Sequence, residues 1–164
     1  MGKVVSVLTV VGKDRAGIIA EVTEVLYRSG CNLQDMSMTI LEQELAMMVI
    51  VRMEASKKAA IEKKLNGLTK GLNLTFFWKD LKKSETLKSS KTSNLSCLVT
   101  AIGKDRTGIV YEVSRLMAKN KLNITDLNSR ILGSGANALY AMMLEVDIPK
   151  KGSLKKNAMN CWLK

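Results

Sequence analysis

The chain has 164 residues, a formal net charge of +11 and no histidine. Without histidine it has no Ser-His-Asp or Cys-His catalytic apparatus and no histidine metal site. Its 46% hydrophobic and 25% charged residues are typical of a globular protein, and no apolar run approaches the roughly 18 residues of a membrane span.

The three cysteines are Cys31, Cys97 and Cys161. An odd, sparse set indicates reduced thiols and a cytoplasmic location, and the spacings match no metal cluster. The N-terminal residues run straight into the first predicted strand, so we expect no signal peptide. We expect neither a metal nor a cofactor.

The first half of the chain predicts a strand, a helix and a hairpin. Residues 4–11 are mostly β-branched and indicate a buried strand. Apolar residues at helical spacing follow from Ile18 to Leu26, and Gly30 should end that helix. Polar and apolar residues alternate from Asn32 to Ile40, which predicts a half-exposed strand, and a turn at 42–44 leads into the next strand at 45–53.

A second helix and a last strand complete this half. Residues 57–70 predict a helix that stops at Gly71, and residues 72–78 predict a strand. The order strand, helix, strand, strand, helix, strand is the split βαβ arrangement of ferredoxin-like α+β folds.

The second half repeats the order after a Lys- and Ser-rich linker. Residues 95–102 predict a strand, 109–117 a helix, and 123–131 with 139–146 a hairpin. After Pro149 the match to the first half fails, so we expect the second domain to be incomplete at its C-terminal end. The predicted organisation is a first domain at 1–80, a linker at 81–93 and a second domain at 94–164.

One phrase occurs in both halves. Residues 12–18 read Gly-Lys-Asp-Arg-Ala-Gly-Ile, and residues 103–109 read Gly-Lys-Asp-Arg-Thr-Gly-Ile, 91 positions later (103 minus 12). Each copy follows a predicted strand and opens a predicted helix. A repeat on this scale indicates two copies of one domain, and the shared phrase is where a function should be sought first.

The shared aspartates and glycines each allow a structural and a functional interpretation. Asp14 and Asp105 stand where a helix cap belongs, so capping alone could explain them. Glycine in the first turn of a helix is unfavourable, which suggests either close helix-on-strand packing or a ligand near the backbone at Gly17 and Gly108. The free amides of a first turn can bind a carboxylate or a phosphate.

Two asparagines open the strand that follows each helix. Asn32 and Asn123 could simply close a turn. They could also bind a ligand, because a side-chain amide both donates and accepts hydrogen bonds.

At these residues the chain resembles the ACT-domain family. The resemblance rests on the repeated Gly-Lys-Asp-Arg-x-Gly-Ile phrase after a strand, with Asn32-Leu33 and Asn123-Ile124 opening the next strand. It covers nearly the whole chain, twice. The tandem pair without a catalytic domain is most similar to the glycine cleavage system transcriptional repressor group. The family usually has proline before the glycine, where this chain has Ala16 and Thr107.

The resemblance implies regulatory binding of a small molecule, often an amino acid, between two ACT units. The implied ligand-binding residues form two mirrored groups, one of Asp14, Gly17 and Ile18 with Asn123 and Ile124, and one of Asp105, Gly108 and Ile109 with Asn32 and Leu33. The protein is then expected to be a non-catalytic regulator that acts through a protein partner.

Two other functions stay open at this point. The lysines gathered at 57–91 and after Asp147 fit a solvated surface, but they also fit a basic nucleic-acid-binding module. The chain could also be a structural dimerisation unit. Because the predicted strand from Asn32 leaves a sheet edge open, we expect the two domains to pair edge to edge. If the second domain lacks its last strand, the strand at 95–102 loses a neighbour, so we expect a homo-oligomer or an unusually unstable second domain.

Overall fold

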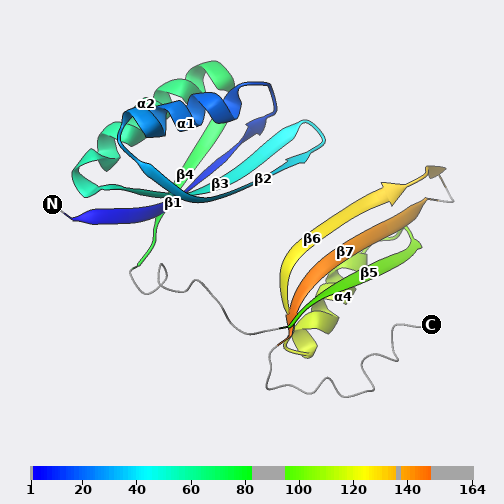
Figure 1. Cartoon of the computed structure of the whole chain (residues 1–164). Helices are drawn as coiled ribbons and strands as arrows, with labels where there is room; N and C mark the ends of the chain where they lie inside the picture. Colours follow the sequence, from blue (N-terminus) through cyan, green and yellow to red (C-terminus); the bar gives the residue numbers. More distant parts are fainter. Residues whose placement is uncertain (1, 83–94, 136–137, 149–164) are drawn as a thin grey trace. The chain divides into compact units, whose positions relative to one another are not determined.

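The computed structural model describes residues 2–82, 95–135 and 138–148, and the chain divides into two compact units, Met1–Ser89 and Ser90–Lys164 (Figure 1). The first unit follows the predicted order. It contains β1 (Lys3–Lys13), α1 (Ile18–Arg28), β2 (Asn32–Leu41), β3 (Glu44–Glu54), a short 3₁₀ turn (Ala55–Lys57), α2 (Lys58–Leu72) and β4 (Leu74–Asp80).

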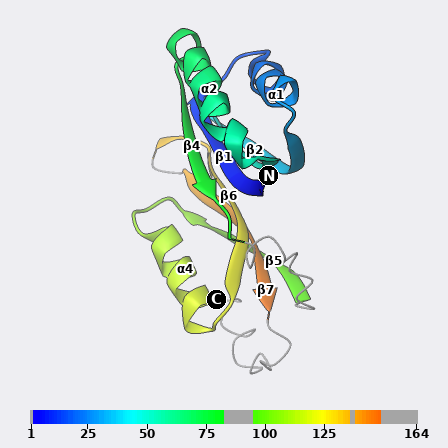
Figure 2. The same ribbon diagram turned by 90° about the vertical axis from the view of Figure 1, so that its left-hand side faces the viewer.

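The strands of the first unit form one antiparallel sheet in the order β2-β3-β1-β4. Both helices cover the same face of this sheet (Figures 1 and 2). The predicted ferredoxin-like fold is therefore confirmed in the first unit. Strand β2 lies at the sheet edge, and all ten of its residues are exposed.

The core of the first unit lies between the sheet and its helices. Along β3 the buried residues alternate with half-buried or exposed ones, which is the pattern of a strand with one covered face. The helices contribute apolar residues at helical spacing. Thirteen buried side chains form this core: Leu8, Val10, Ile18, Val22, Leu26, Leu45, Met47, Val49, Val51, Met53, Ile61, Leu65 and Leu74.

A polar contact ties the last strand to the first strand and to α2. The buried Ser6 hydroxyl donates to Asp80 Oδ1 at 2.6 Å, and Lys58 Nζ donates to the same oxygen at 2.6 Å. The hydrogen bonds from Lys58 and then Ser6 lower the pKa of the Asp80 carboxyl, because both favour its charged form.

The second unit is shorter in its described part. It contains β5 (Leu95–Lys104), α4 (Ile109–Lys119), β6 (Asn123–Leu132) and β7 (Leu139–Ile148). The three strands form an antiparallel sheet in the order β5-β7-β6, which matches β1-β3-β2 of the first unit. The segment after Pro149, where we expected the second domain to be incomplete, lies outside the described residues.

The core of the second unit is correspondingly small. Four buried side chains form it: Met117, Met142, Leu144 and Val146. In the first unit Leu8 and Val10 of β1 are fully buried, whereas Val99 and Ala101 at the matching positions of β5 are only half-buried. In the first unit α2 and β4 complete the cover over these positions.

Two helices do not end at a glycine, as the sequence analysis assumed for helix ends. Helix α2 continues through Gly71 to Leu72, and the left-handed residue that follows is Asn73, with φ 52°. In the second unit Lys121, with φ 58°, occupies the left-handed position that Gly30 fills in the first. Asparagine adopts this backbone region more readily than most residues, which explains why a helix can end without glycine.

The repeated Gly12 and Gly103 have different surroundings. A Cβ at Gly12 would lie 2.5 Å from the Asn73 carbonyl oxygen, so the start of β4 packs directly on this glycine. A Cβ at Gly103 would meet nothing within 4 Å in the part of the chain that the structure describes. The same residue is thus sterically required in one unit only.

We therefore predict opposite outcomes for alanine at these positions. Gly12→Ala should destabilise the first unit by roughly 1–3 kcal/mol, because backbone must move away from the new methyl group. Gly103→Ala should be neutral or slightly stabilising, because alanine has less backbone entropy to lose on folding. Urea unfolding followed by hydrogen exchange in each unit measures both. An equal loss of stability for Gly103→Ala would show that another backbone packs on β5 in solution.

Candidate functional site

The shared phrase forms the connection between a strand and a helix in each unit. The Asp14 N–H donates to the Gln43 carbonyl at 2.7 Å, and the Asp105 N–H donates to the Ala138 carbonyl at 3.0 Å. Each loop is thereby attached to the far turn of its own hairpin.

The two glycines of the phrase have left-handed backbones. Gly17 has φ 96° and Gly108 has φ 95°, and each directly precedes the first helical residue. A Cβ at Gly17 would meet only the side-chain ends of Arg15 and Glu21, both at 3.6 Å. Close helix-on-strand packing therefore does not explain these glycines. The positive φ does, because a residue with a Cβ is strained there.

The aspartates of the phrase do not cap the helices. Neither α1 nor α4 has a side-chain hydrogen bond at its N-cap, and the side chains of Asp14 and Asp105 are exposed. The capping interpretation thus fails, because glycine itself occupies the cap position. Each unit presents an exposed carboxylate beside the amides of a first helical turn, which have no acceptor within the helix.

An ion pair braces each loop, and the sequence analysis did not find it. Arg15 Nη2 donates to both carboxylate oxygens of Glu21 at 2.8 Å, and Arg106 donates to Glu112 from both terminal nitrogens at 2.9 and 2.5 Å. Each arginine also donates to the carbonyl of the next residue, Ala16 or Thr107. The signal was present in the repeat, because both the arginine and the glutamate recur at the offset of 91 (112 minus 21).

This pair shifts the pKa of both of its members in the second loop. The hydrogen bond from Arg106 lowers the pKa of the Glu112 carboxyl, and Glu112 in turn raises the pKa of the Arg106 guanidinium. The guanidinium charge at this loop is therefore already neutralised.

The predicted asparagines lie at the opposite end of each sheet from the loops. Asn32 pairs with Arg52, which pairs with Val5 near the start of β1, whereas the loop follows the end of β1. A single unit thus brings Asp14, Gly17 and Ile18 together, and separately Asn32 and Leu33, but it does not join the two groups. The joining of residues from different units remains a prediction.

A bulge follows each of these asparagines. The strand register shifts between Leu33 and Asp35 in β2 and between Ile124 and Asp126 in β6. The sequence analysis did not predict this irregularity. Bulges of this kind bend a strand edge and are common beside binding sites.

The predicted ligand-binding residues differ in how exposed their side chains are. Ile18 is 1% exposed and belongs to the core, so its side chain supports the loop from below. Ile109 and Ile124 are half-buried, while Leu33 is exposed. The groups that a ligand could reach without rearrangement are the aspartates, the glycine backbones, the asparagines and Leu33.

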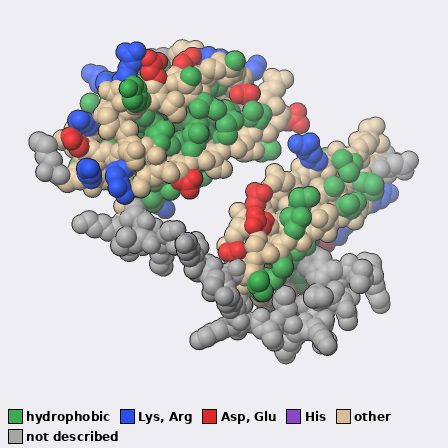
Figure 3. Space-filling view, viewed as in Figure 1, with side chains coloured by type: hydrophobic (Ala, Val, Ile, Leu, Met, Phe, Trp, Pro, Cys, Tyr) green, Lys and Arg blue, Asp and Glu red, His purple; other side chains and the backbone are tan. Residues whose placement is uncertain are grey.

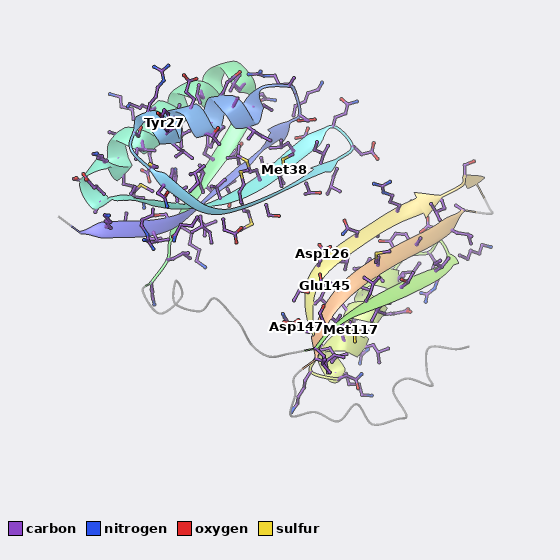
Figure 4. The ribbon with its side chains drawn as sticks, in the orientation of Figure 1. Tyr27, Met38, Met117, Asp126, Glu145 and Asp147 are labelled. Carbon is purple, nitrogen blue, oxygen red and sulfur yellow. The ribbon has the colours of Figure 1, made fainter. Side chains whose placement is uncertain are left out.

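Apolar side chains are exposed along the edge strand β2 of the first unit. They are Leu33, Met36, Met38 and Ile40, and hydrophobic side chains gather on this unit in the space-filling view (Figure 3). Leu33 lines a hollow together with Tyr27 of α1, whereas Met38 lies elsewhere on the strand (Figure 4). An exposed edge of this composition favours pairing with another strand edge, and that pairing stays a prediction.

Two negative findings concern the described residues alone. No group of three or more Cys, Asp or Glu side chains there is arranged to hold a metal ion. No helix within these ranges is both long enough and apolar enough to cross a membrane.

The repeated loop on two ferredoxin-like units defines a tandem α+β protein of the regulatory-domain type. Residues 5–79 match the ACT-domain family. A UPF0237 protein of Streptococcus mutans is 34% identical over 70 residues, which are 42% of this chain and 80% of that protein. The chain therefore belongs to the ACT-domain family, and it is a tandem ACT-domain protein.

Other relatives cover less of either sequence. A UPF0237 protein of Neisseria meningitidis serogroup A is 32% identical over 63 residues. The match covers 38% of this chain and 66% of that relative's length.

Two crystal structures share the fold across nearly the whole chain. An unknown protein from Galdieria sulphuraria has a TM-score of 0.72 and 24% identity, and the match covers 90% of this chain and 84% of the Galdieria chain. A protein described as a candidate glycine cleavage system transcriptional repressor has a TM-score of 0.71 and 18% identity, covering 97% and 90%.

We predict that side chains at the left-handed glycines are costly. Gly17→Ala and Gly108→Ala should each destabilise their unit by about 1–2 kcal/mol, and valine should cost more because it is β-branched. Gly17→Asn should cost less than alanine, because asparagine tolerates this backbone region. Urea unfolding of the three Gly17 variants measures the order, and alanine as stable as the parent would contradict the positive φ.

We predict that Glu112 titrates below its usual range because of Arg106. Its pKa should lie below 4.5 in the parent protein and return toward 4.5 in Arg106→Gln. Because the folded-state value is the lower one, the contribution to stability is present above pH 4.5 and is lost as pH falls through the folded pKa. NMR titration of the carboxyl carbon measures this, with Arg115→Gln on the same helix as the control.

Proposed function

We propose that this protein is a non-catalytic regulator whose two ACT domains bind an amino acid between them and act on a protein partner. Transcriptional regulation of amino-acid metabolism is the role that fits best, because a candidate glycine cleavage system transcriptional repressor shares the fold over both units. One observation carries the proposal: Asp14 and Asp105 are exposed, have no ion pair among the described residues, and lie in the loop that leads to the glycine at the start of each helix.

These groups suit the two ends of an α-amino acid. The Asp14 carboxylate can pair with an α-ammonium group, and the first-turn amides after Gly17 can bind an α-carboxylate. The second unit offers the same pair at Asp105 and Gly108.

The paired arginines argue against a phosphate ligand. Arg15 and Arg106 are both engaged by a glutamate of their own helix, which leaves Lys13 and Lys104 as the cations of the phrase without an ion pair among the described residues. A nucleotide needs several free cations at the loop, whereas a small zwitterion needs none. One free lysine in each loop therefore favours an amino acid over a nucleotide.

The rest of the proposed site comes from the other unit. Asn123 and Ile124 would meet the Asp14 loop, and Asn32 and Leu33 would meet the Asp105 loop. The bulge that follows each asparagine bends the edge strand locally. The side chain of the asparagine could therefore turn toward a ligand.

A second candidate function rests on a different surface. A hollow between the end of α1 and the start of α2 is lined by Arg28, Lys57 and Lys64. Arg28 is paired with Glu24 and Lys57 with Glu54, so Lys64 is the lining cation without an ion pair among the described residues, and a nucleic-acid phosphate would compete with the two glutamates for the others. Oligonucleotide binding that weakens steeply with salt, and that Lys57→Gln with Lys64→Gln reduces, would favour this alternative.

We predict a rise in melting temperature with at least one of the twenty amino acids, because a ligand of the folded state stabilises it. Calorimetry should then show that Asn32→Ala and Asn123→Ala weaken binding by roughly 1–3 kcal/mol each, the cost of leaving a buried partner unsatisfied. Asp14→Asn and Asp105→Asn should weaken it as well, because they remove the charge that meets the ammonium group.

Asn128→Ala serves as the control, because Asn128 lies on β6 but hydrogen-bonds within its strand to Asp126. Unchanged affinity in all four site variants, or no amino-acid binding by the parent, would leave backbone strain as the whole explanation of the repeated phrase.

A further inference from the structure

Among the described residues, the sheet of the second unit has one face covered by α4 and one open face. Buried Met142, Leu144 and Val146 of β7 point toward α4, so the residues between them point the other way. Residues paired directly across antiparallel strands share a face. The strand register therefore identifies the residues of the open face. We call three residues paired directly across β5, β7 and β6 a row.

The open face has a central apolar part. Its middle row is Thr100, Met143 and Asn128. On β5 the rows on either side contain Leu98 and Ile102, which are 65% and 66% exposed, and Met143 is 47% exposed. Large apolar side chains this exposed indicate a surface that is covered in use.

The two ends of the open face carry opposite charges. Asp126, Glu145 and Asp147 lie at one end, on β6 and β7 (Figures 3 and 4). Lys104 and Arg130 lie at the other end. Within the described ranges no ion pair joins any of these five residues to another side chain.

We propose that this open face binds the same face of a second copy of the chain, with a twofold axis through Met143 and the strands antiparallel. The occupant follows from the arrangement of charge, because a twofold contact must match a surface to itself. This interface does not depend on any ligand, so it stands apart from the proposed function.

In the rows next to Met143 the twofold places complementary side chains opposite each other, while in the outer rows it places Lys104 opposite Ser96 and Asp147 opposite Leu139. Arg130 lies one row from Met143 on β6 and Asp126 lies one row from it on the other side, so each meets the other across the interface. In the same way Ile102 meets Leu98 along β5. Met143 meets itself.

A hollow in the face fits this arrangement. It lies over Ala141 and is also lined by Arg130, Asn128 and Met143. Ala141 occupies the row that the twofold places opposite Glu145. The small alanine side chain thus leaves room for the Glu145 carboxylate of the other copy, beside the Arg130 guanidinium.

The first unit lacks this pattern although it shares the fold. Thr39 holds the position of Arg130, and Ile50 and Arg52 hold those of Glu145 and Asp147. Asp35, which matches Asp126, and Lys13, which matches Lys104, are retained. The self-complementary charge therefore belongs to the second unit, and the first unit provides an internal control.

The interface is small, so we expect a dimer that depends on concentration. Three strands of ten residues each present a face of about 500 Å², from strand spacings of about 4.8 Å and a rise of about 3.3 Å per residue. Stable interfaces bury about 800 Å² on each partner. Association in the micromolar range follows.

Sedimentation equilibrium of the full chain tests the charge pairing. Arg130→Glu and Asp126→Arg should each raise the dimer dissociation constant at least tenfold, because each change enters the interface twice, and the double variant should restore it. Thr39→Glu in the first unit should leave it unchanged. A parent that stays monomeric, or a dimer insensitive to Arg130→Glu, would overturn the proposal, and the latter would indicate another surface such as the β5 edge.

Cross-linking locates the axis independently of stability. With the native cysteines replaced by serine, Met143→Cys should yield a covalent dimer with a short bismaleimide, since only a residue near the axis meets its own copy. Met48→Cys, at the matching position of the first unit, should yield none. Equal yields from the two variants, or no dimer from Met143→Cys, would reject the axis. Circular dichroism of each variant confirms that it is folded.

Discussion

In the part of the chain that the structure describes, each sheet is covered by helices on one face only, and the remaining features depend on that constraint. The alternation of buried and outward residues along β3 and β7 fixes which side chains enter the core. It also leaves an uncovered face and a free edge strand on each unit. Because helix and strand must be joined tightly at the end of β1 and of β5, the connection uses a left-handed glycine, Gly17 or Gly108. The surfaces on which a ligand or a second copy could bind are those the helices leave open.

The strands, helices and domain order could be predicted from the sequence because they follow from periodicity. Residues at helical and alternating spacing mark the elements of both units, and the repeated phrase marks where each helix begins. The chemistry of that phrase was harder to predict. Asp14 looked like a cap, but a cap depends on backbone angles, and the left-handed Gly17 takes the position instead. The Arg15–Glu21 pair spans a turn, and the spacing of the two residues in the sequence does not by itself predict their contact.

Other features needed coordinates for a physical reason. The bulges after Leu33 and Ile124 are register shifts, and register depends on the partner strand rather than on local propensity. The different surroundings of Gly12 and Gly103 depend on Asn73, at the start of β4 and 61 residues after Gly12 in the chain (73 minus 12). How the two ACT domains meet, and so whether Asp14 reaches Asn123, remains a prediction from family resemblance alone.

The unequal cores have a consequence for how the chain loses its structure. Thirteen buried side chains hold the first unit, whereas four hold the described part of the second. We expect two cores of such different size to unfold in separate transitions, in which case a single midpoint temperature would not describe this protein. Heating or denaturant should pass through a partly folded species in which the first domain persists while the second has opened. Trp78, packed against the larger core, reports on the later transition.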